Sequence, residues 1–173
     1  MVHDEDHVAR VIRIAKFLAE KEGANIEIVL KSAELHDVAR NFENHAFASA
    51  MVAEKILREQ GFDEKFIFAV KDSIETHSFS TKIEPKTLEA RILSDADKLD
   101  AMGAVGVARA FMFSGEKGRS IEDTLRHFEE KLLKLKNNLY TDTAKRIGKN
   151  RHRFLELFYE EIKRELAFED FDQ

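Results

Sequence analysis

The segment Leu93-Ser94-Asp95-Ala96-Asp97-Lys98-Leu99-Asp100 places three carboxylates within six positions of an otherwise apolar run. Burying a carboxylate without a partner is costly, so an acidic cluster in such a setting needs hydrogen-bond donors, cations or a metal ion beside it. Candidate partners lie far upstream, at His7 and at the adjacent pair His36-Asp37. Since each group lies on its own predicted helical segment, we expect folding to bring these side chains together as metal ligands.

The composition predicts one soluble globular domain spanning residues 1–173. The chain is 43% hydrophobic and 35% charged, and its single proline and seven glycines favour long helices. It has no cysteine, which excludes disulfides, thiolate zinc sites and cysteine nucleophiles. Any metal must therefore be held by histidine, carboxylate and water.

The charge pattern gives no sign of a nucleic-acid or membrane partner. The net charge is −5, which does not fit a generally basic nucleic-acid binder. The acidic N-terminus lacks the apolar region of a signal peptide, and no apolar run approaches membrane-spanning length. We therefore expect a cytoplasmic protein.

The hydrophobic periodicity predicts an all-α fold, because apolar residues recur at three-and-four spacing and no period-two stretch indicates a sheet. The expected helices span residues 4–22, 26–37, 43–60, a segment capped by Asp63, the segment with the acidic cluster, 121–135 and 141–166. Phe47, Met51 and Phe154 are expected to face inward. Pro85 is expected at a helix start, a polar loop over 78–82, and a bend at Gly103 and Gly106.

On composition alone, a metal site and an accidental His-Asp pair are equally good interpretations in a helical protein with seven histidines. The ordered motifs add information. They are His7-x-x-Arg10-Val11, Leu35-His36-Asp37, His45 with Ser49-Ala50, His77-Ser78 and Asp95-Ala96-Asp97-Lys98-Leu99-Asp100-Ala101-x-Gly103-x-x-Gly106-x-x-Arg109.

This series resembles the HD-domain metal-dependent phosphohydrolase superfamily, and most closely its bacterial and archaeal branch with a DAD[KR]L[DE]A-x-G segment. The similarity continues to Phe154 and so covers almost the whole chain. It implies an all-α HD-domain helical bundle whose metal ligands are His7, His36, Asp37 and Asp97. Asp97 is preferred to Asp95 because Ala96-Asp97-Lys98-Leu99 matches the A-D-[RK]-L segment of the superfamily; Asp95 then serves as a hydrogen-bond acceptor or helix cap.

The resemblance also implies catalytic roles for Asp37, Asp97, His77 and Asp100, with Asp100 orienting a ligand or water. His45 and His77 are expected to contact phosphate or the attacking water. A second metal ion at these two histidines, or a hydrogen-bonded core role, are the alternatives.

Substrate phosphates are expected to contact cations within the resembling motifs: Arg10, Lys98, Arg109 and Lys131, together with His45. For each cation, a structural salt bridge to Asp95 or Asp100 is the alternative. No glutamate follows the His36-Asp37 pair within four residues, which disfavours a nucleoside monophosphatase or alarmone hydrolase. Arg40 stands there instead and indicates either anion binding or helix capping.

The expected function is a metal-dependent phosphohydrolase in which metal-activated water attacks a phosphoester or phosphoanhydride of a nucleotide, as a phosphatase or a nucleoside triphosphate pyrophosphohydrolase. The alternatives are a non-catalytic module that binds metal and nucleotide, and a di-iron oxygenase. Manganese is the first choice of divalent ion, with magnesium, nickel, cobalt, iron or zinc as alternatives. The expected partner is a small phosphorylated molecule, and the chain is expected to be a monomer or homodimer.

Overall fold

The computed structural model describes residues 5–78 and 83–171, and it confirms the all-α prediction, with no strand in these two ranges. The helices are α1 Glu5–Glu22, α2 Ile26–Leu35, α3 His45–Glu59, α4 Glu64–Thr76, α5 Leu88–Asp100, α6 Gly103–Glu116, α7 Ile121–Glu130, the 3₁₀ helix η2 Leu132–Asn138, and α8 Asp142–Leu166. Among them, no helix is long and apolar enough to cross a membrane.

The helix starts follow local capping chemistry. The side chain of Asn25 accepts hydrogen bonds from the backbone of Glu27 and Ile28, and Asp63 accepts one from Phe66. Ser120 and Asp123 form a capping box at the start of α7. These short-range contacts explain why most helix boundaries are readable from the sequence.

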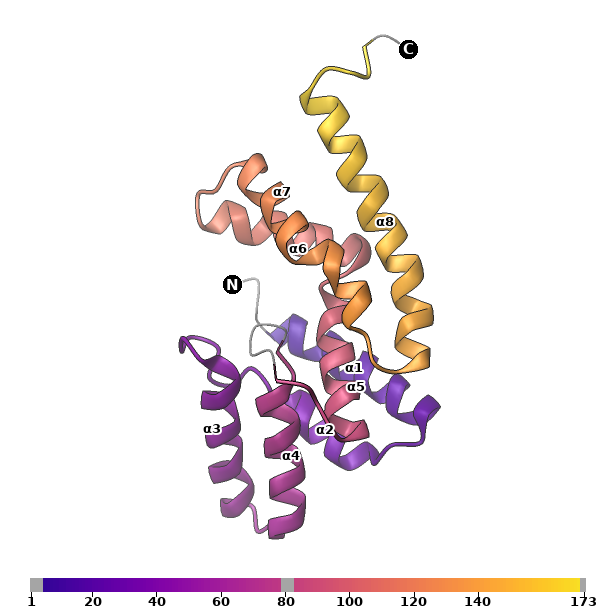
Figure 1. The fold of residues 1–173 in the computed structure, drawn as a ribbon. Helices are drawn as coiled ribbons and strands as arrows, with labels where there is room; N and C mark the ends of the chain where they lie inside the picture. Colours follow the sequence, from indigo (N-terminus) through magenta and orange to yellow (C-terminus); the bar gives the residue numbers. More distant parts are fainter. Residues whose placement is uncertain (1–4, 79–82, 172–173) are drawn as a thin grey trace.

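The helix that carries the acidic cluster, α5, lies at the centre of the bundle and contacts α1, α2, α4 and α8 (Figure 1). Its apolar side chains belong to a core that continues from α1 to α8. The hairpin of α3 and α4 packs on one side, and α6, α7 and α8 lie on the other (Figure 1). As a result, the C-terminal end of α5 lies between two groups of helices.

The break after α5 occurs at Gly103, as predicted, where φ is +71° and favours glycine. Gly106 lies inside α6 and makes no second break. It allows a close backbone approach instead, because a Cβ at this position would lie 2.2 Å from the carbonyl oxygen of Ala101.

The prediction that Phe47, Met51 and Phe154 face inward is wrong, because these residues are 53%, 47% and 44% exposed. The helix α3 buries a face of small residues, Ala46, Ser49, Ala50 and Ala53, against its neighbours. The opposite face, which carries the two large side chains, is therefore left to solvent. In α8, the buried face runs through Ala144, Gly148, His152, Leu155 and Tyr159, and excludes Phe154.

Other boundaries differ from the predicted ones. The amphipathic helix ends at Glu130, and the 3₁₀ helix that follows buries Leu132 and Leu135, which lie three residues apart and share one face of such a helix. Pro85 precedes α5, which begins at Leu88 after the N-cap Thr87. Residues 79–82 of the predicted polar loop lie outside the described residues.

Candidate metal centre and cationic cavity

The carboxylates of α5 divide between two faces of the helix, as their spacing requires. Asp95 is buried and accepts hydrogen bonds at 2.8 Å from the backbone N–H of Tyr140, the backbone N–H of Thr141 and the Thr141 hydroxyl. It therefore holds the segment that begins α8. This arrangement matches the predicted acceptor role of Asp95.

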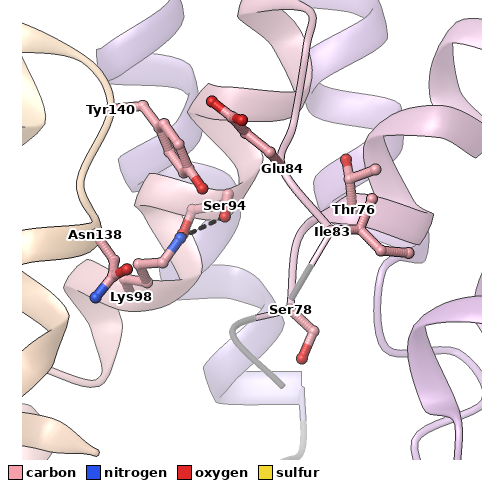
Figure 2. Close-up of a pocket in the computed structure, with 8 residues that line it drawn as sticks. All are labelled: Thr76, Ser78, Ile83, Glu84, Ser94, Lys98, Asn138 and Tyr140. Carbon is pink, nitrogen blue, oxygen red and sulfur yellow. Dashed lines mark hydrogen bonds between the residues drawn. The ribbon is translucent and has the colours of Figure 1, made fainter. Parts of the chain in front are cut away.

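Lys98 lies on the same side as Asp95 and lines a pocket of about 350 Å³ with Ser94, Tyr140 and Glu84 (Figure 2). Its ammonium group donates to the Ser94 hydroxyl and lies 4.9 Å from the centre of the Tyr140 ring. Burial lowers the pKa of Lys98, and the nearby Lys131 adds to this effect. The structure thus places Lys98 in a different pocket from Arg109 and Lys131, two of the other predicted phosphate-binding cations.

Asp97 and Asp100, three residues apart on the other face, point toward a group of histidines at the ends of four helices. His7 lies in the first turn of α1, His36 follows α2, His45 begins α3 and His77 follows α4. Successive rings in this order lie edge to face, with 5.3, 5.2 and 5.7 Å between centroids for His7–His36, His36–His77 and His77–His45. The four histidines from the first four helices therefore meet at one place, beside Asp97 and Asp100 of α5.

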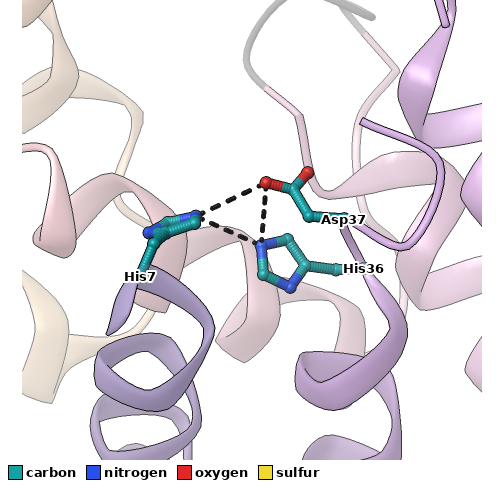
Figure 3. A group of neighbouring side chains, drawn as sticks. All are labelled: His7, His36 and Asp37. Carbon is teal, nitrogen blue, oxygen red and sulfur yellow. Dashed lines mark hydrogen bonds and ion pairs between the residues drawn. The ribbon is translucent and has the colours of Figure 1, made fainter. Parts of the chain in front are cut away.

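The most compact group consists of His7, His36 and Asp37 (Figure 3). The Nε2 atoms of the two histidines are 3.4 Å apart. Asp37 Oδ2 lies 3.6 Å from His7 Nε2 and 3.7 Å from His36 Nε2. Asp97 Oδ1 approaches the same group, at 3.5 Å from His7 Nε2.

The hydrogen bonds behind these imidazoles determine which nitrogen is available. His36 Nδ1 lies 2.8 Å from the Ala33 carbonyl oxygen, which can only accept, so this nitrogen carries the proton. His7 Nδ1 faces Asp100 Oδ2 at 2.8 Å in the same way. With each Nδ1 facing an acceptor, the Nε2 atoms of the two rings are the nitrogens that face each other.

A divalent cation fits this group of atoms. Asp37 Oδ2 is buried and has no hydrogen-bond partner among the described residues, and it faces the Nε2 atoms of His7 and His36. Ligand atoms each about 2.1 Å from an ion lie roughly 3.0 to 3.4 Å apart at common coordination angles. The observed separations of 3.4 to 3.7 Å are slightly wider than this range.

A second compact group comprises Asp37, His45 and His77. His77 Nδ1 donates to the Ile74 carbonyl oxygen at 2.6 Å, so its Nε2 is the available atom. The guanidinium of Arg40 lies beside this group, with Nη1 3.0 Å from His45 Nε2 and 3.4 Å from Asp37 Oδ1. One carboxylate, Asp37, is thus shared by both groups.

The surroundings of the centre favour ionised forms of Asp97 and Asp100 and neutral forms of His45 and His77. Burial and the neighbouring His36 lower the pKa of His77 to about 4. Burial and Arg40 lower the pKa of His45. Burial alone would raise the pKa of Asp97, but the imidazoles around it lower that pKa far below its usual range. Neutral imidazole and carboxylate are the forms that bind divalent ions.

Asp100 supports the centre from behind. It receives hydrogen bonds from Arg10 Nε at 2.6 Å and from Arg109 Nη1, as well as facing His7. These contacts lower its pKa although burial opposes them. Both Arg10 and Arg109 form the salt bridge to Asp100 that was the alternative to phosphate binding, and the Arg10 guanidinium binds both carboxylate oxygens.

Next to the centre lies a cavity of about 170 Å³ with a strongly cationic lining. The basic side chains in this lining are those of Arg40, Arg109, Arg119 and Lys131, and His127 adds an imidazole. No carboxylate is among the described residues that line the cavity. Arg40 lines the cavity and contacts His45 of the second ligand group, and Arg109 links the cavity to Asp100. The metal centre and the cavity are therefore contiguous.

Comparison with known proteins identifies the family. The HD domain model matches residues 5–102. YpgQ of Bacillus subtilis is 33% identical over 174 residues, covering 95% of this chain and 84% of YpgQ.

This chain belongs to the HD domain family.

The similarity to solved structures covers more of the chain than residues 5–102, which the HD domain model matches. The crystal structure of YpgQ in complex with ADP has a TM-score of 0.80 at 33% identity, covering 94% of this chain and 86% of that one. A Lactobacillus plantarum protein has a TM-score of 0.85 at 33% identity, over 96% and 88% of the two chains. A Bacillus thuringiensis protein described as an HD-superfamily hydrolase has a TM-score of 0.77 at 37% identity, over 95% and 87%.

The HD domain match contains both ligand groups, whereas most of the cationic cavity lies beyond it, on α6 and α7. Sequence reasoning missed Arg119 and His127 as cavity residues. Arg119 lies with Lys117 and Gly118 in the loop between α6 and α7, and His127 lies on the amphipathic helix α7. The loop charges were the one available signal, but nothing local shows that they face the metal centre.

Proposed function

We propose that this HD domain protein is a metal-dependent phosphohydrolase that acts on nucleoside polyphosphates and releases pyrophosphate. The observation that carries the proposal is the cationic cavity beside the histidine–aspartate centre. Phosphoryl transfer depends mainly on positioning and on neutralising charge. A lining of three arginines, a lysine and a histidine suits a chain of phosphates better than a single phosphate or an apolar group.

His7, His36, Asp37 and Asp97 would hold one divalent ion, because their available atoms converge and are oriented by partners behind them. When bound, the ion supplies charge for a phosphoryl oxygen and lowers the pKa of water. Asp100 fixes the ring of His7 by accepting a hydrogen bond from its Nδ1–H.

Arg109 and Lys131 bind the phosphates beyond the scissile bond in this proposal. Arg40 lies between the ligand groups and the cavity, where it contacts the phosphoryl group under attack. Neutral His45 and His77 face the same space and orient the attacking water. Lys98 has no part in this arrangement because it lines the other pocket.

The comparisons support the nucleotide part of the proposal, since YpgQ was crystallised with ADP. The continuous core from α1 to α8 supports treating residues 1–173 as one domain. A di-iron oxygenase needs two ions, and the contact of Arg40 with His45 of the second ligand group argues against a second ion.

The test is release of phosphate and of pyrophosphate from a panel of nucleoside mono-, di- and triphosphates, with Mn²⁺, Mg²⁺ or chelator. We expect pyrophosphate from triphosphates with Mn²⁺, none with chelator, and none from Asp97→Asn. Asp142→Asn, which changes an aspartate at the surface, is the matched control. Metal binding and nucleotide-dependent thermal stabilisation without any product would replace the hydrolase with a binding module.

A further inference from the structure

The second ligand group has a complete set of donor atoms for a cation. One available atom each from Asp37, His45 and His77 lies within 4.8 Å of the other two. His77 is fully oriented by its bond to Ile74, and the three side chains come from the ends of α2, α3 and α4. By chemistry alone, this group resembles the first and would hold a second divalent ion.

A positively charged side chain of the protein, that of Arg40, already contacts two residues of this group. Arg40 Nη1 contacts His45 Nε2 at 3.0 Å and Asp37 Oδ1 at 3.4 Å. Guanidinium groups only donate hydrogen bonds, so His45 Nε2 is the acceptor and its lone pair is occupied. An ion in the same place would compete for that lone pair and would meet the positive charge of Arg40 at close range.

The position of Arg40 follows from the chain. Its Cα is three residues beyond Asp37, in the turn that follows α2, so its side chain can fold back on Asp37 without any long-range contact. Its side chain is about one-third exposed, whereas that of Asp37 is buried. The short chain segment between the two residues thus keeps the guanidinium of Arg40 close to the buried carboxylate of Asp37.

We propose that Arg40 takes the place of a second metal ion, keeps the centre mononuclear, and masks a latent divalent-cation site formed by Asp37, His45 and His77. The inference rests on the proposed function, in which His7, His36, Asp37 and Asp97 hold the first ion. Removing the guanidinium frees Asp37 Oδ1 and His45 Nε2 together, and these two residues with His77 would then hold a second ion.

The test counts bound Mn²⁺ per chain by equilibrium dialysis and elemental analysis, with electron paramagnetic resonance to detect coupling between two ions. We expect one ion in the wild type and two in Arg40→Ala, with a coupled signal only in the variant. Arg119→Ala removes another cavity arginine that contacts neither Asp37 nor His45, and should keep one ion. The double variant Arg40→Ala/His45→Ala should return to one ion.

The outcomes separate this inference from the proposed function. A single ion in both the wild type and Arg40→Ala, or two ions in the wild type, overturns the inference alone. A wild type that holds no ion overturns the proposed function as well. If Arg40→Ala does not fold, Arg40→Gln, which keeps much of the side-chain volume without the charge, gives the same count.

Discussion

The imidazole Nδ1 of His7 lies 2.8 Å from the carboxylate of Asp100, although 93 residues separate them in the chain. This contact orients His7 Nε2 toward Asp37 and Asp97. Both side chains are buried, so water does not replace the bond when it is removed.

Asp100→Asn should therefore weaken metal binding without removing a ligand. Loss of such a partner behind a metal-binding histidine typically reduces affinity about 10- to 100-fold. Titration of the metal-free protein with Mn²⁺ by calorimetry measures the effect, with circular dichroism to verify folding. An affinity within twofold of the wild type would show that Asp100 does not orient His7, and Asp142→Asn again serves as the control.

The close approach at Gly106 supports the turn between α5 and α6, which follows Asp100 directly. Gly106→Ala should destabilise the protein by about 2 kcal/mol or more, because the new Cβ would overlap the rigid backbone carbonyl of Ala101. Gly115→Ala lies in the same helix with nothing within 4 Å of the new Cβ, and should be neutral or stabilise by about 0.5 kcal/mol. Urea denaturation compares the two variants, and equal effects would contradict the close approach.

Arg119 offers a test of the cavity that leaves the metal ligands untouched. Arg119→Ala should raise KM for a nucleoside triphosphate by about three- to tenfold, as expected for losing one exposed charge-assisted contact, with little change in kcat. Arg126→Ala, an exposed arginine of α7 that pairs with Asp123 and lies outside the cavity lining, should leave both constants unchanged. Equal steady-state constants for both variants would remove Arg119 from the substrate site.

The buried His77 makes the stability of the metal-free protein depend on pH. Its pKa is about 4 in the folded protein and about 6.5 in the unfolded chain, so between these values the unfolded chain binds a proton that the folded protein does not. The free energy of unfolding should thus fall as the pH drops from 6.5 to 4, by up to about 3 kcal/mol from this group. Urea denaturation at a series of pH values measures the slope.

His77→Asn is the matched variant for that slope. It should flatten the dependence while leaving a residual part from His45 and His127, whose pKa values are also lowered by burial. An unchanged slope in His77→Asn would show that other groups cause the acid sensitivity.

The sequence by itself determined the helices and the identity of the ligand motifs. Caps such as Asn25 and Asp63, and the positive φ at Gly103, act within a few residues, so their effects are visible locally. The order of His7, His36-Asp37 and Asp97 was readable for the same reason, as a pattern of residue types at helix ends.

Only the tertiary structure decided which charges meet. Asp95 and Asp97 differ by two positions, yet packing turns the first toward Thr141 and the second toward His7. Packing likewise removes Lys98 from the cationic cavity, adds Arg119 to it, and sets Arg40 against His45. The physical reason is that a helix fixes the spacing of its own side chains, while the partner facing each one depends on how distant helices pack.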